Sequence, residues 1–152
     1  MIAQRKVVND VLIAPVEPRH AQRIAILSEQ LGYPANSADT LRRIHAILDS
    51  SSDAAYVALV EDHLVVGWLH VFHTLRLETA PFCEIGGLVV HEEWRGKGIG
   101  GALLQHAKLW TTTKGTQVLR VRSNIIREDA HKFYLAQGFQ KLKEQAVFEH
   151  RD

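Results

Sequence analysis

The sequence predicts an α+β fold, a mixed αβα arrangement around one β-sheet, in a single domain spanning residues 1–152. The length of 152 residues suits one ordinary domain, and no internal repeat or linker divides it. Hydrophobic residues make up 46% of the chain and charged residues 23%, a balance that argues against disorder. Strand and helix signals follow the order βααβββαβαββ, which fits neither a purely parallel doubly wound sheet nor an all-β sandwich.

Four helices are predicted from apolar residues at helical spacing and from residues that start or stop helices. Gly32 and Pro34 end the first helix, because proline cannot continue it. Asn36, Ser37 and Asp39 each offer an N-cap for the second helix, and Gly138 ends the last one. The four helices span residues 17–31, 36–48, 98–110 and 129–137.

The predicted strands are short runs rich in β-branched and aromatic residues. The second and third runs flank the polar turn Glu61–His63, which predicts a β-hairpin. Gly86 and Gly87 interrupt the fourth run, and paired glycines inside a strand mark a bulge or a close approach. The strands are predicted at residues 11–14, 55–60, 64–72, 82–90, 117–122 and 145–150.

Charge, cysteine content and hydropathy exclude several classes of protein. With 18 Lys and Arg against 17 Asp and Glu, the net charge is +1, so neither a nucleic acid nor a membrane surface is an expected partner. The single cysteine, Cys83, excludes an internal disulfide, and no spacing of histidines predicts a metal site. No apolar run reaches the ~18 residues of a membrane span. Because residues 1–6 also lack a secretory signal, we expect a cytoplasmic protein.

One stretch of the chain is strongly basic. Between Arg95 and Arg127 there are seven Lys and Arg residues and no Asp or Glu, so all 17 acidic residues lie elsewhere. This distribution predicts an anionic ligand, and clustering on a solvated helix face is the alternative.

A glycine-rich turn at residues 95–101 separates the fourth strand from the third helix. It is not a Walker loop, because Gly98 follows Lys97 where Ser or Thr would hold magnesium. It is not a dinucleotide fingerprint, because the next strand, Val118–Arg122, has no acid for a ribose. Glycines let backbone N–H groups converge on phosphate oxygens at a helix N-terminus, so the turn predicts a pyrophosphate cradle. A glycine-rich helix start without a ligand is the alternative.

Three ordered motifs between residues 82 and 139 carry a resemblance to a known family. Arg95-x-x-Gly98-x-Gly100 resembles the Q/R-x-x-G-x-G/A acetyl-CoA motif of the GNAT N-acetyltransferase superfamily. The strand Glu84–Val90 and the later segment Ala130–Phe139 also resemble that superfamily. The resemblance implies a twisted mixed sheet of about six to seven strands flanked by four helices. It also implies acetyl-CoA as co-substrate and no metal.

Coenzyme A is expected along the fourth strand and the glycine turn. The resemblance implies that the fourth and fifth strands splay apart to admit the pantetheine arm, with a bulge at the paired glycines. Backbone groups of Leu88 and Val90 then pair with the pantetheine, and amides of the turn hold the pyrophosphate. Many relatives have Asn where this chain has Arg127, and Asn124 lies earlier, so either residue fits the last contact. The implied cofactor-binding residues are Leu88, Val89, Val90, Arg95, Gly96, Lys97, Gly98, Ile99, Gly100, Gly101, Asn124 and Arg127.

Acetyl transfer to an amine requires a proton acceptor, because alkyl amines are mostly protonated at neutral pH. The resemblance implies Glu84 as this general base, eleven residues before Arg95, with a water molecule as the alternative. A structural carboxylate paired with Arg120 or Arg122 is the other interpretation of Glu84.

The reaction also requires a donor for the developing oxyanion and a proton for the departing thiolate. The resemblance implies the backbone N–H of Leu88 or Val89 as the oxyanion donor. It implies the Tyr134 phenol as the donor to the thiolate. An aromatic core residue beside Phe133 and Phe139 is the other interpretation of Tyr134.

The acceptor amine is expected between the first two helices, the Leu75–Glu78 region and a C-terminal hairpin. Tyr33, His70 and Glu78 are the predicted substrate contacts, and His73, on the opposite face of the same strand, is the alternative to His70. The motifs look most like those of small-molecule acetyltransferases, including aminoglycoside 6'-N-acetyltransferase-like proteins. The predicted function is transfer of an acetyl group from acetyl-CoA to a primary amine of a small molecule, by direct attack in a ternary complex.

Two other functions stay open. Acetylation of a protein N-terminus or lysine would need a flat, acidic acceptor groove, whereas small amines fit an enclosed pocket. A non-catalytic coenzyme A-binding sensor is the second, and the presence of Glu84 and Tyr134 argues against it. Residues 145–149 would pair across a homodimer or face solvent.

Overall fold

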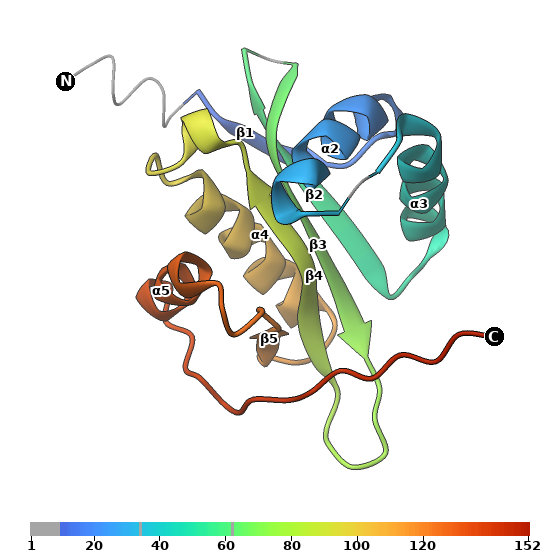
Figure 1. Ribbon diagram of the computed structural model, residues 1–152, viewed down its shortest axis with the longest axis vertical. Coiled ribbons are helices and arrows are strands. Elements are labelled where there is room, and N and C mark those ends of the chain that lie inside the picture. Colours follow the sequence, from blue (N-terminus) through green and yellow to red (C-terminus); the bar gives the residue numbers. More distant parts are fainter. Residues whose placement is uncertain (1–9, 34, 62) are drawn as a thin grey trace. The chain divides into compact units, whose positions relative to one another are not determined.

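The computed structural model describes residues 10–33, 35–61 and 63–152 in two compact units, Met1–Val121 and Arg122–Asp152. Figure 1 labels the elements. The prediction made from residues 1–6, and Asp62 of the predicted hairpin turn, lie outside the described residues. None of the described helices combines the length and the hydropathy that a membrane span needs.

The first unit contains a five-stranded sheet in the order β1-β2-β3-β4-β5 (Figure 1). The first four strands pair antiparallel with their neighbours, and β5 runs parallel to β4. The mixed α+β sheet is confirmed, but within the described residues it has five strands rather than six or seven. The strands are β1 (Leu12–Pro15), β2 (Asp53–Val60), β3 (Leu64–Thr74), β4 (Phe82–Val90) and β5 (Leu119–Val121).

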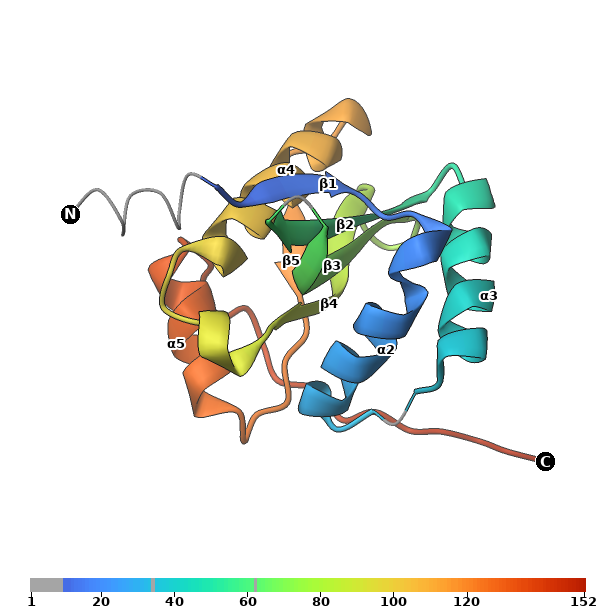
Figure 2. The same ribbon diagram turned by 90° about the horizontal axis from the view of Figure 1, so that it is seen from above.

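Helices cover both faces of this sheet (Figure 2). Trp68 of β3 packs against a core that α2 and α3 share with the sheet, whereas a Cβ on the preceding Gly67 would touch Ile99 and Leu103 of α4. The helix predicted over residues 17–31 is one α-helix between two 3-10 turns. The segments are η1 (Pro18–His20), α2 (Ala21–Ser28), η2 (Glu29–Leu31), α3 (Ser37–Asp49) and α4 (Ile99–Thr113).

The core between α2, α3 and the sheet follows from helical and strand periodicity. Residues spaced by three on α2 and by two on β2 point the same way and are buried together. This core consists of Val16, Ala21, Ile24, Leu27, Ile44, Val57, Leu59, Val65 and Val89.

The predicted helix signals at Gly32 and Asn36 are confirmed, whereas Pro34 lies outside the described residues. Gly32 adopts φ +83° after η2, a left-handed conformation that glycine reaches without strain. The Asn36 side chain accepts a hydrogen bond from the backbone N–H of Asp39 at 2.8 Å, as an N-cap should.

Two β-bulges shift the register of the sheet. In β3, Val66 is extra, because Ala58 pairs with Gly67 while Leu59 pairs with Val65. In β4, Gly86 is extra, because His70 pairs with Gly87 while Val71 pairs with Ile85. The second bulge confirms the interruption predicted at the paired glycines.

In the first unit, the 3-10 turn η3 (Glu92–Trp94) precedes α4. The second unit holds one helix. The helix is α5 (Glu128–Ala136), and it stops where Gly138 adopts φ +92°. The Phe139 N–H then donates to the Tyr134 carbonyl at 3.0 Å, which closes the helix end.

The terminal strand predicted at residues 145–150 is wrong, and no C-terminal hairpin forms among residues 139–152. Val147 and Phe148 are 86% and 92% exposed. Adjacent residues of a strand point to opposite faces, so these two side chains cannot share one buried face. The strand predicted at residues 117–122 is shorter than expected and contains only Leu119–Val121.

Candidate functional site

β4 loses one of its neighbours halfway along its length. From Cys83 to Ile85 it pairs with β5 on one side and with β3 on the other. From Gly86 to Val90, among the described residues, it pairs with β3 alone. This open edge of β4, residues 86–90, agrees with the splayed strands that the resemblance implies.

Hydrogen bonding determines which backbone groups face the open edge. The His91 N–H donates to the Val66 carbonyl of β3 at 2.8 Å. Backbone groups of an antiparallel strand alternate between its two sides. Val89 therefore bonds toward β3 like His91, whereas Leu88 and Val90 face the open edge.

The glycine turn leads from this edge into α4. Gly96 and Gly98 adopt φ +75° and +84°, and a Cβ on either would meet nothing within 4 Å. Glycine is therefore required here by conformation rather than by space. In the first turn of α4, the N–H groups of Ile99, Gly100 and Gly101 have no acceptor within the helix, and no acidic residue stands there. The turn presents free donors at the positive end of a helix.

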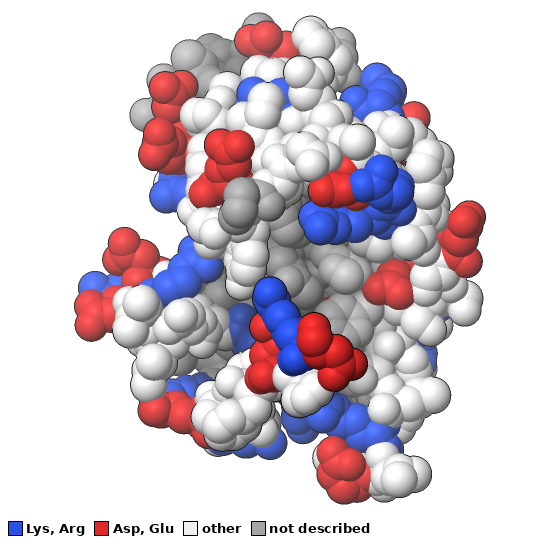
Figure 3. Space-filling view, turned by 45° about the vertical axis from the view of Figure 1, so that its right-hand side comes forward, with Lys and Arg blue, Asp and Glu red and all other residues white. Residues whose placement is uncertain are grey.

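Two basic side chains flank the turn. Arg95 donates from Nε to the Val90 carbonyl at 3.0 Å and from Nη2 to Oε1 of Gln30 at 3.4 Å, which ties the turn to β4. Lys97 is exposed, with Nζ 5.9 Å from the centre of the Trp94 ring. On the face shown in Figure 3, basic and acidic side chains are mixed, so charge alone does not mark a site there.

The paired glycines of β4 lie against two rings of β3. A Cβ on Gly86 would stand 2.6 Å from Nδ1 of His70, and a Cβ on Gly87 would stand 2.6 Å from Cη2 of Trp68. Both contacts are too short for any side chain, so these rings occupy the space that glycine leaves.

Glu84 lies on the same face of the sheet as His70. It is 8% exposed and stands in register with Phe72 of β3 and Arg120 of β5. The Arg120 guanidinium lies 4.1 Å from the centre of the Phe82 ring. The position suits a carboxylate at the site, and it equally suits a carboxylate beside a structural arginine.

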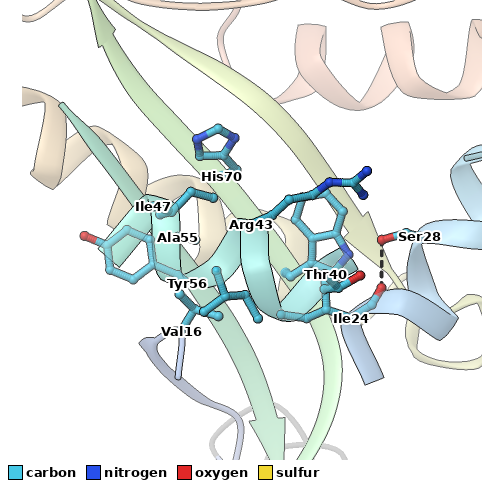
Figure 4. A pocket seen from close by; sticks show the side chains of 11 residues that line it. Val16, Ile24, Ser28, Thr40, Arg43, Ile47, Ala55, Tyr56 and His70 are labelled. Carbon is cyan, nitrogen blue, oxygen red and sulfur yellow. Dashed lines mark hydrogen bonds between the residues drawn. The ribbon is translucent and has the colours of Figure 1, made fainter. Parts of the chain in front are cut away.

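A cavity of about 180 Å³ opens between α2, α3, β2 and β3 (Figure 4). His70, one of the predicted substrate contacts, lines it, and the described lining residues include Arg43 but no carboxylate. Nε1 of Trp68 is buried and has no hydrogen-bond partner among the described residues. The lining residues are Val16, Ile24, Ser28, Thr40, Arg43, Ile44, Ile47, Ala55, Tyr56, Trp68 and His70.

The other two predicted substrate contacts lie elsewhere in the first unit. Tyr33 follows η2 and is 68% exposed, and Glu78 is exposed in the loop between β3 and β4. Neither lines the cavity. No pattern in the sequence marks Arg43 as a lining residue, because it lies on the exposed side of an amphipathic helix.

Asp53 is a further polar residue that sequence reasoning missed. Its Oδ1 lies 2.8 Å from Nε2 of His70. A regular hairpin would place Asp53 opposite Val71, with His70 on the other face. The bulge at Val66 brings the two side chains to one face, and no sequence signal marks that bulge.

Cys83 is a buried free thiol on β4. Burial raises its pKa above the ordinary value of 9.0, which opposes the thiolate form that a nucleophile needs.

Tyr134 lies on α5 in the second unit. Its ring meets those of Phe133 and Phe139 edge-on, at centroid distances of 5.2 and 5.5 Å. Burial raises the pKa of its phenol above 10.0, and the charge of Arg127 opposes that rise. The phenol is therefore protonated at neutral pH and able to donate.

Asn124 and Arg127 form the turn before α5. The Asn124 side chain accepts from the Ile126 N–H at 3.1 Å, and its carbonyl lies 2.9 Å from Nε2 of His131. The Arg127 side chain is exposed. Asn124 is thus occupied in shaping the turn, whereas Arg127 extends into solvent.

Comparison with known proteins places these features in a family. Residues 51–141 match the model of the acetyltransferase (GNAT) domain. The chain is 27% identical over 123 residues to an aminoglycoside N(6')-acetyltransferase type 1 of Stenotrophomonas maltophilia, covering 78% of this chain and 80% of that one. It is 36% identical over 78 residues to an aminoalkylphosphonate N-acetyltransferase of Salmonella typhimurium, covering 51% of each.

The fold is also similar to that of solved structures. An aminoglycoside N-acetyltransferase in complex with CoA superposes with a TM-score of 0.82 at 18% identity, covering 93% of this chain and 95% of that one. The matched domain model includes the open edge of β4, the glycine turn and α5. The chain therefore belongs to the GNAT acetyltransferase family and is an acyltransferase.

Proposed function

We propose that the protein transfers an acetyl group from acetyl-CoA to a primary amine of a small molecule, by direct attack in a ternary complex. The observation that carries this proposal is the open edge of β4, which runs into a turn of free backbone donors. An extended, hydrogen-bonding arm with a diphosphate at its end has the chemistry to fit both parts.

The residues present fit coenzyme A. Leu88 and Val90 offer backbone groups to a pantetheine arm along the edge of β4, although Arg95 already engages the Val90 carbonyl. The N–H groups of residues 99–101 offer donors to the pyrophosphate, with the Lys97 charge beside them. For the remaining contact we favour Arg127 over Asn124, whose side chain is engaged in its own turn.

The chain supplies three groups for the chemistry, and acetyl-CoA supplies the activated acyl group. Glu84, directly or through a water molecule, is the family-implied acceptor of the amine proton. Leu88 is the oxyanion donor that the pairing favours over Val89, because its N–H faces the open edge. Tyr134 carries a proton that suits donation to the departing thiolate.

The cavity favours a small acceptor. Sites for drug-sized ligands measure roughly 300–1,000 Å³. At about 180 Å³, this cavity suits a smaller amine than a multi-ring aminoglycoside.

An amine that carries an acidic group is a second candidate acceptor. Arg43 lines the cavity, no carboxylate does, and the indole N–H of Trp68 lacks a partner among the described residues. These groups complement an anion, whereas a polycationic aminoglycoside calls for carboxylates. The similarity to an aminoalkylphosphonate N-acetyltransferase supports the same acceptor class.

Thermal unfolding with ligands tests the cofactor assignment. Acetyl-CoA should raise the melting temperature, while NADPH and ATP at the same concentration should not, because only a ligand that binds the folded state stabilises it. An absence of any shift at saturating acetyl-CoA removes the cofactor assignment.

Thiol release tests the reaction. The purified chain is incubated with acetyl-CoA and a panel of amines that includes 2-aminoethylphosphonate, an aminoglycoside and a lysine peptide. Release with the phosphonate alone supports the acidic acceptor, and release with the peptide supports a protein acetyltransferase. Binding of acetyl-CoA without release by any amine indicates the sensor function.

Location and assembly complete the proposal. A buried free thiol at Cys83 suits the reducing cytoplasm, where we place the protein. The homodimer remains a prediction. Residues 145–149, which were expected to pair across it, form no strand within the single chain.

A further inference from the structure

We propose that His70, held by Asp53, takes the proton of the acceptor amine, in place of Glu84. This inference rests on the acetyl transfer proposed above and assigns a proton acceptor to it. A hydrogen-bonded chain, a glycine that makes room for the ring, and the cavity support it separately.

The hydrogen-bonded chain fixes the state of the imidazole. Nε2 of His70 lies 2.8 Å from Oδ1 of Asp53. The other carboxylate oxygen accepts from the Ser50 hydroxyl at 2.7 Å, and that hydroxyl accepts from the Ser52 N–H at 3.1 Å. A carboxylate only accepts, so Nε2 carries the hydrogen and Nδ1 keeps a lone pair. Asp53 thereby presents Nδ1 as a base.

Nδ1 faces the bulge in β4. A Cβ on Gly86 would stand 2.6 Å from it, so only glycine leaves the imidazole in this position. Nδ1 has no hydrogen-bond partner among the described residues. The open edge of β4 begins at this bulge, two residues from the backbone N–H of Leu88. A base is thus placed next to the strand segment proposed to hold the thioester.

The cavity places the acceptor beside the His70 ring. His70 lines it, and its side chain is 26% exposed. Glu84 is 8% exposed and does not line the cavity, although it lies on the same face of the sheet. An amine in the cavity therefore contacts His70 and not Glu84.

The step balances as follows. The substrate ammonium gives one proton to Nδ1, which frees the nitrogen lone pair to bond to the carbonyl carbon, and the nitrogen gives its second proton to solvent as that bond forms. The carbon–sulfur bond breaks, and its electron pair leaves on sulfur, which takes a proton from the Tyr134 phenol. His70 releases its proton to solvent, and the phenol recovers one from solvent.

Two substitutions test the pair, with a neighbouring histidine as the matched control. His70→Gln removes the base and should lower kcat/KM for the best amine of the panel by about 100-fold or more. Asp53→Asn should lower it by a smaller factor, because an amide can donate to Nε2 and so move the hydrogen to Nδ1. His73→Gln, on the opposite face of β3, should keep the wild-type rate. The acetyl-CoA-induced rise in melting temperature should persist in all three variants, which shows that they fold.

The pH profile provides a readout that a merely structural role would not move. The charged or titratable side chains facing His70 are Asp53 of β2, Glu84 of β4 and Arg43 of α3. The His70→Gln variant lacks the base and reacts only with amine that is already deprotonated in solution. Its kcat/KM should therefore rise tenfold per pH unit over the pH range where the wild-type kcat/KM does not change. A pH profile of His70→Gln that runs parallel to the wild-type profile overturns the proposal. A wild-type rate in His70→Gln together with a lower rate in Glu84→Gln also overturns it.

The tautomer can be measured without turnover. Nitrogen-15 NMR of the wild-type imidazole should show the hydrogen of His70 on Nε2, and Asp53→Asn should shift it toward Nδ1. A hydrogen on Nδ1 in the wild type overturns the proposal. A wild-type chain that releases thiol with none of the amines overturns the proposed function and this role together, whereas turnover that survives His70→Gln overturns only the pair.

Discussion

The indole of Trp68 fills the space beside Gly87, where a Cβ would stand 2.6 Å from Cη2 of the ring. Gly86 has the same relationship to Nδ1 of His70. The glycines in the middle of β4 thus hold two rings of the cavity wall against the strand.

Gly86→Ala should therefore destabilise the protein by about 1–3 kcal/mol, because the new methyl group overlaps the imidazole. Urea unfolding measures the change. The same substitution in a His70→Ala background should cost much less, since the overlapping ring is gone. Equal costs in both backgrounds would show that the backbone, and not the ring, requires glycine at this position.

Asn36→Ala should lower the free energy of unfolding by about 1 kcal/mol, because the Asp39 N–H loses its acceptor at the start of α3. Asn36→Ser keeps an acceptor oxygen without placing a second carboxylate against Asp39, whose Oδ2 accepts from the Asn36 amide at 2.9 Å, and serves as the control in the same urea titration. A loss of equal size in both variants contradicts the capping role.

Gly98→Ala should cost about 1–2 kcal/mol of stability, because it forces a side chain into a left-handed conformation. Gly115→Ala is a matched control, with φ +81° at the far end of α4 and nothing within 4 Å of its Cβ. Calorimetric titration should show weaker acetyl-CoA binding in Gly98→Ala and unchanged binding in Gly115→Ala, since only Gly98 lies in the proposed pyrophosphate cradle. Weakened binding in both variants would point to a global effect rather than a local one.

His20 should make the protein sensitive to mild acid. Its ring is buried, and burial lowers its pKa from 6.5, with the charge of Arg19 adding to the effect. The unfolded chain then takes up the proton more readily than the folded one, so the free energy of unfolding falls as the pH drops through 6.5. Urea titrations at pH 7.5 and 5.5 should show this loss reduced in His20→Gln and unchanged in the exposed control His45→Gln.

Tyr134→Phe should lower kcat about 100-fold while the affinity for acetyl-CoA changes little, if its phenol donates to the thiolate. Phe133→Leu, which alters the neighbouring ring and no hydrogen bond, is the control. A small effect on kcat with a loss of stability in Tyr134→Phe would favour the aromatic core role. Steady-state thiol release and thermal unfolding together make the distinction.

The elements of the fold were predictable wherever a local signal was strong. Asn36 carries its capping information in its own side chain, and Gly86 with Gly87 marks a bulge that the structure contains. The absence of a strand at residues 145–150 was not predictable, because an apolar pair such as Val147 and Phe148 forms a strand only where tertiary structure supplies a partner surface.

The site was predictable where the backbone carries it. The glycine turn and the edge at Leu88 follow from motifs whose geometry depends on chain conformation. The cavity was less accessible, because its polar residues come from different elements. Asp53 meets His70 only through a register shift at Val66, a residue that looks like any other in an apolar strand.

Each of the two bulges reverses the alternation of side chains between the two faces of the sheet. Strand side chains repeat with a period of two, so each extra residue exchanges odd for even positions beyond it. The extra Val66 places His70 on the same face as Asp53, and the extra Gly86 places Glu84 on the same face as Val89. Deleting either extra residue would remove no other side chain, but it would move one residue of the corresponding pair to the opposite face of the sheet. Insertions and deletions in this family should therefore be tolerated poorly at these two positions and well in the exposed loop between β3 and β4.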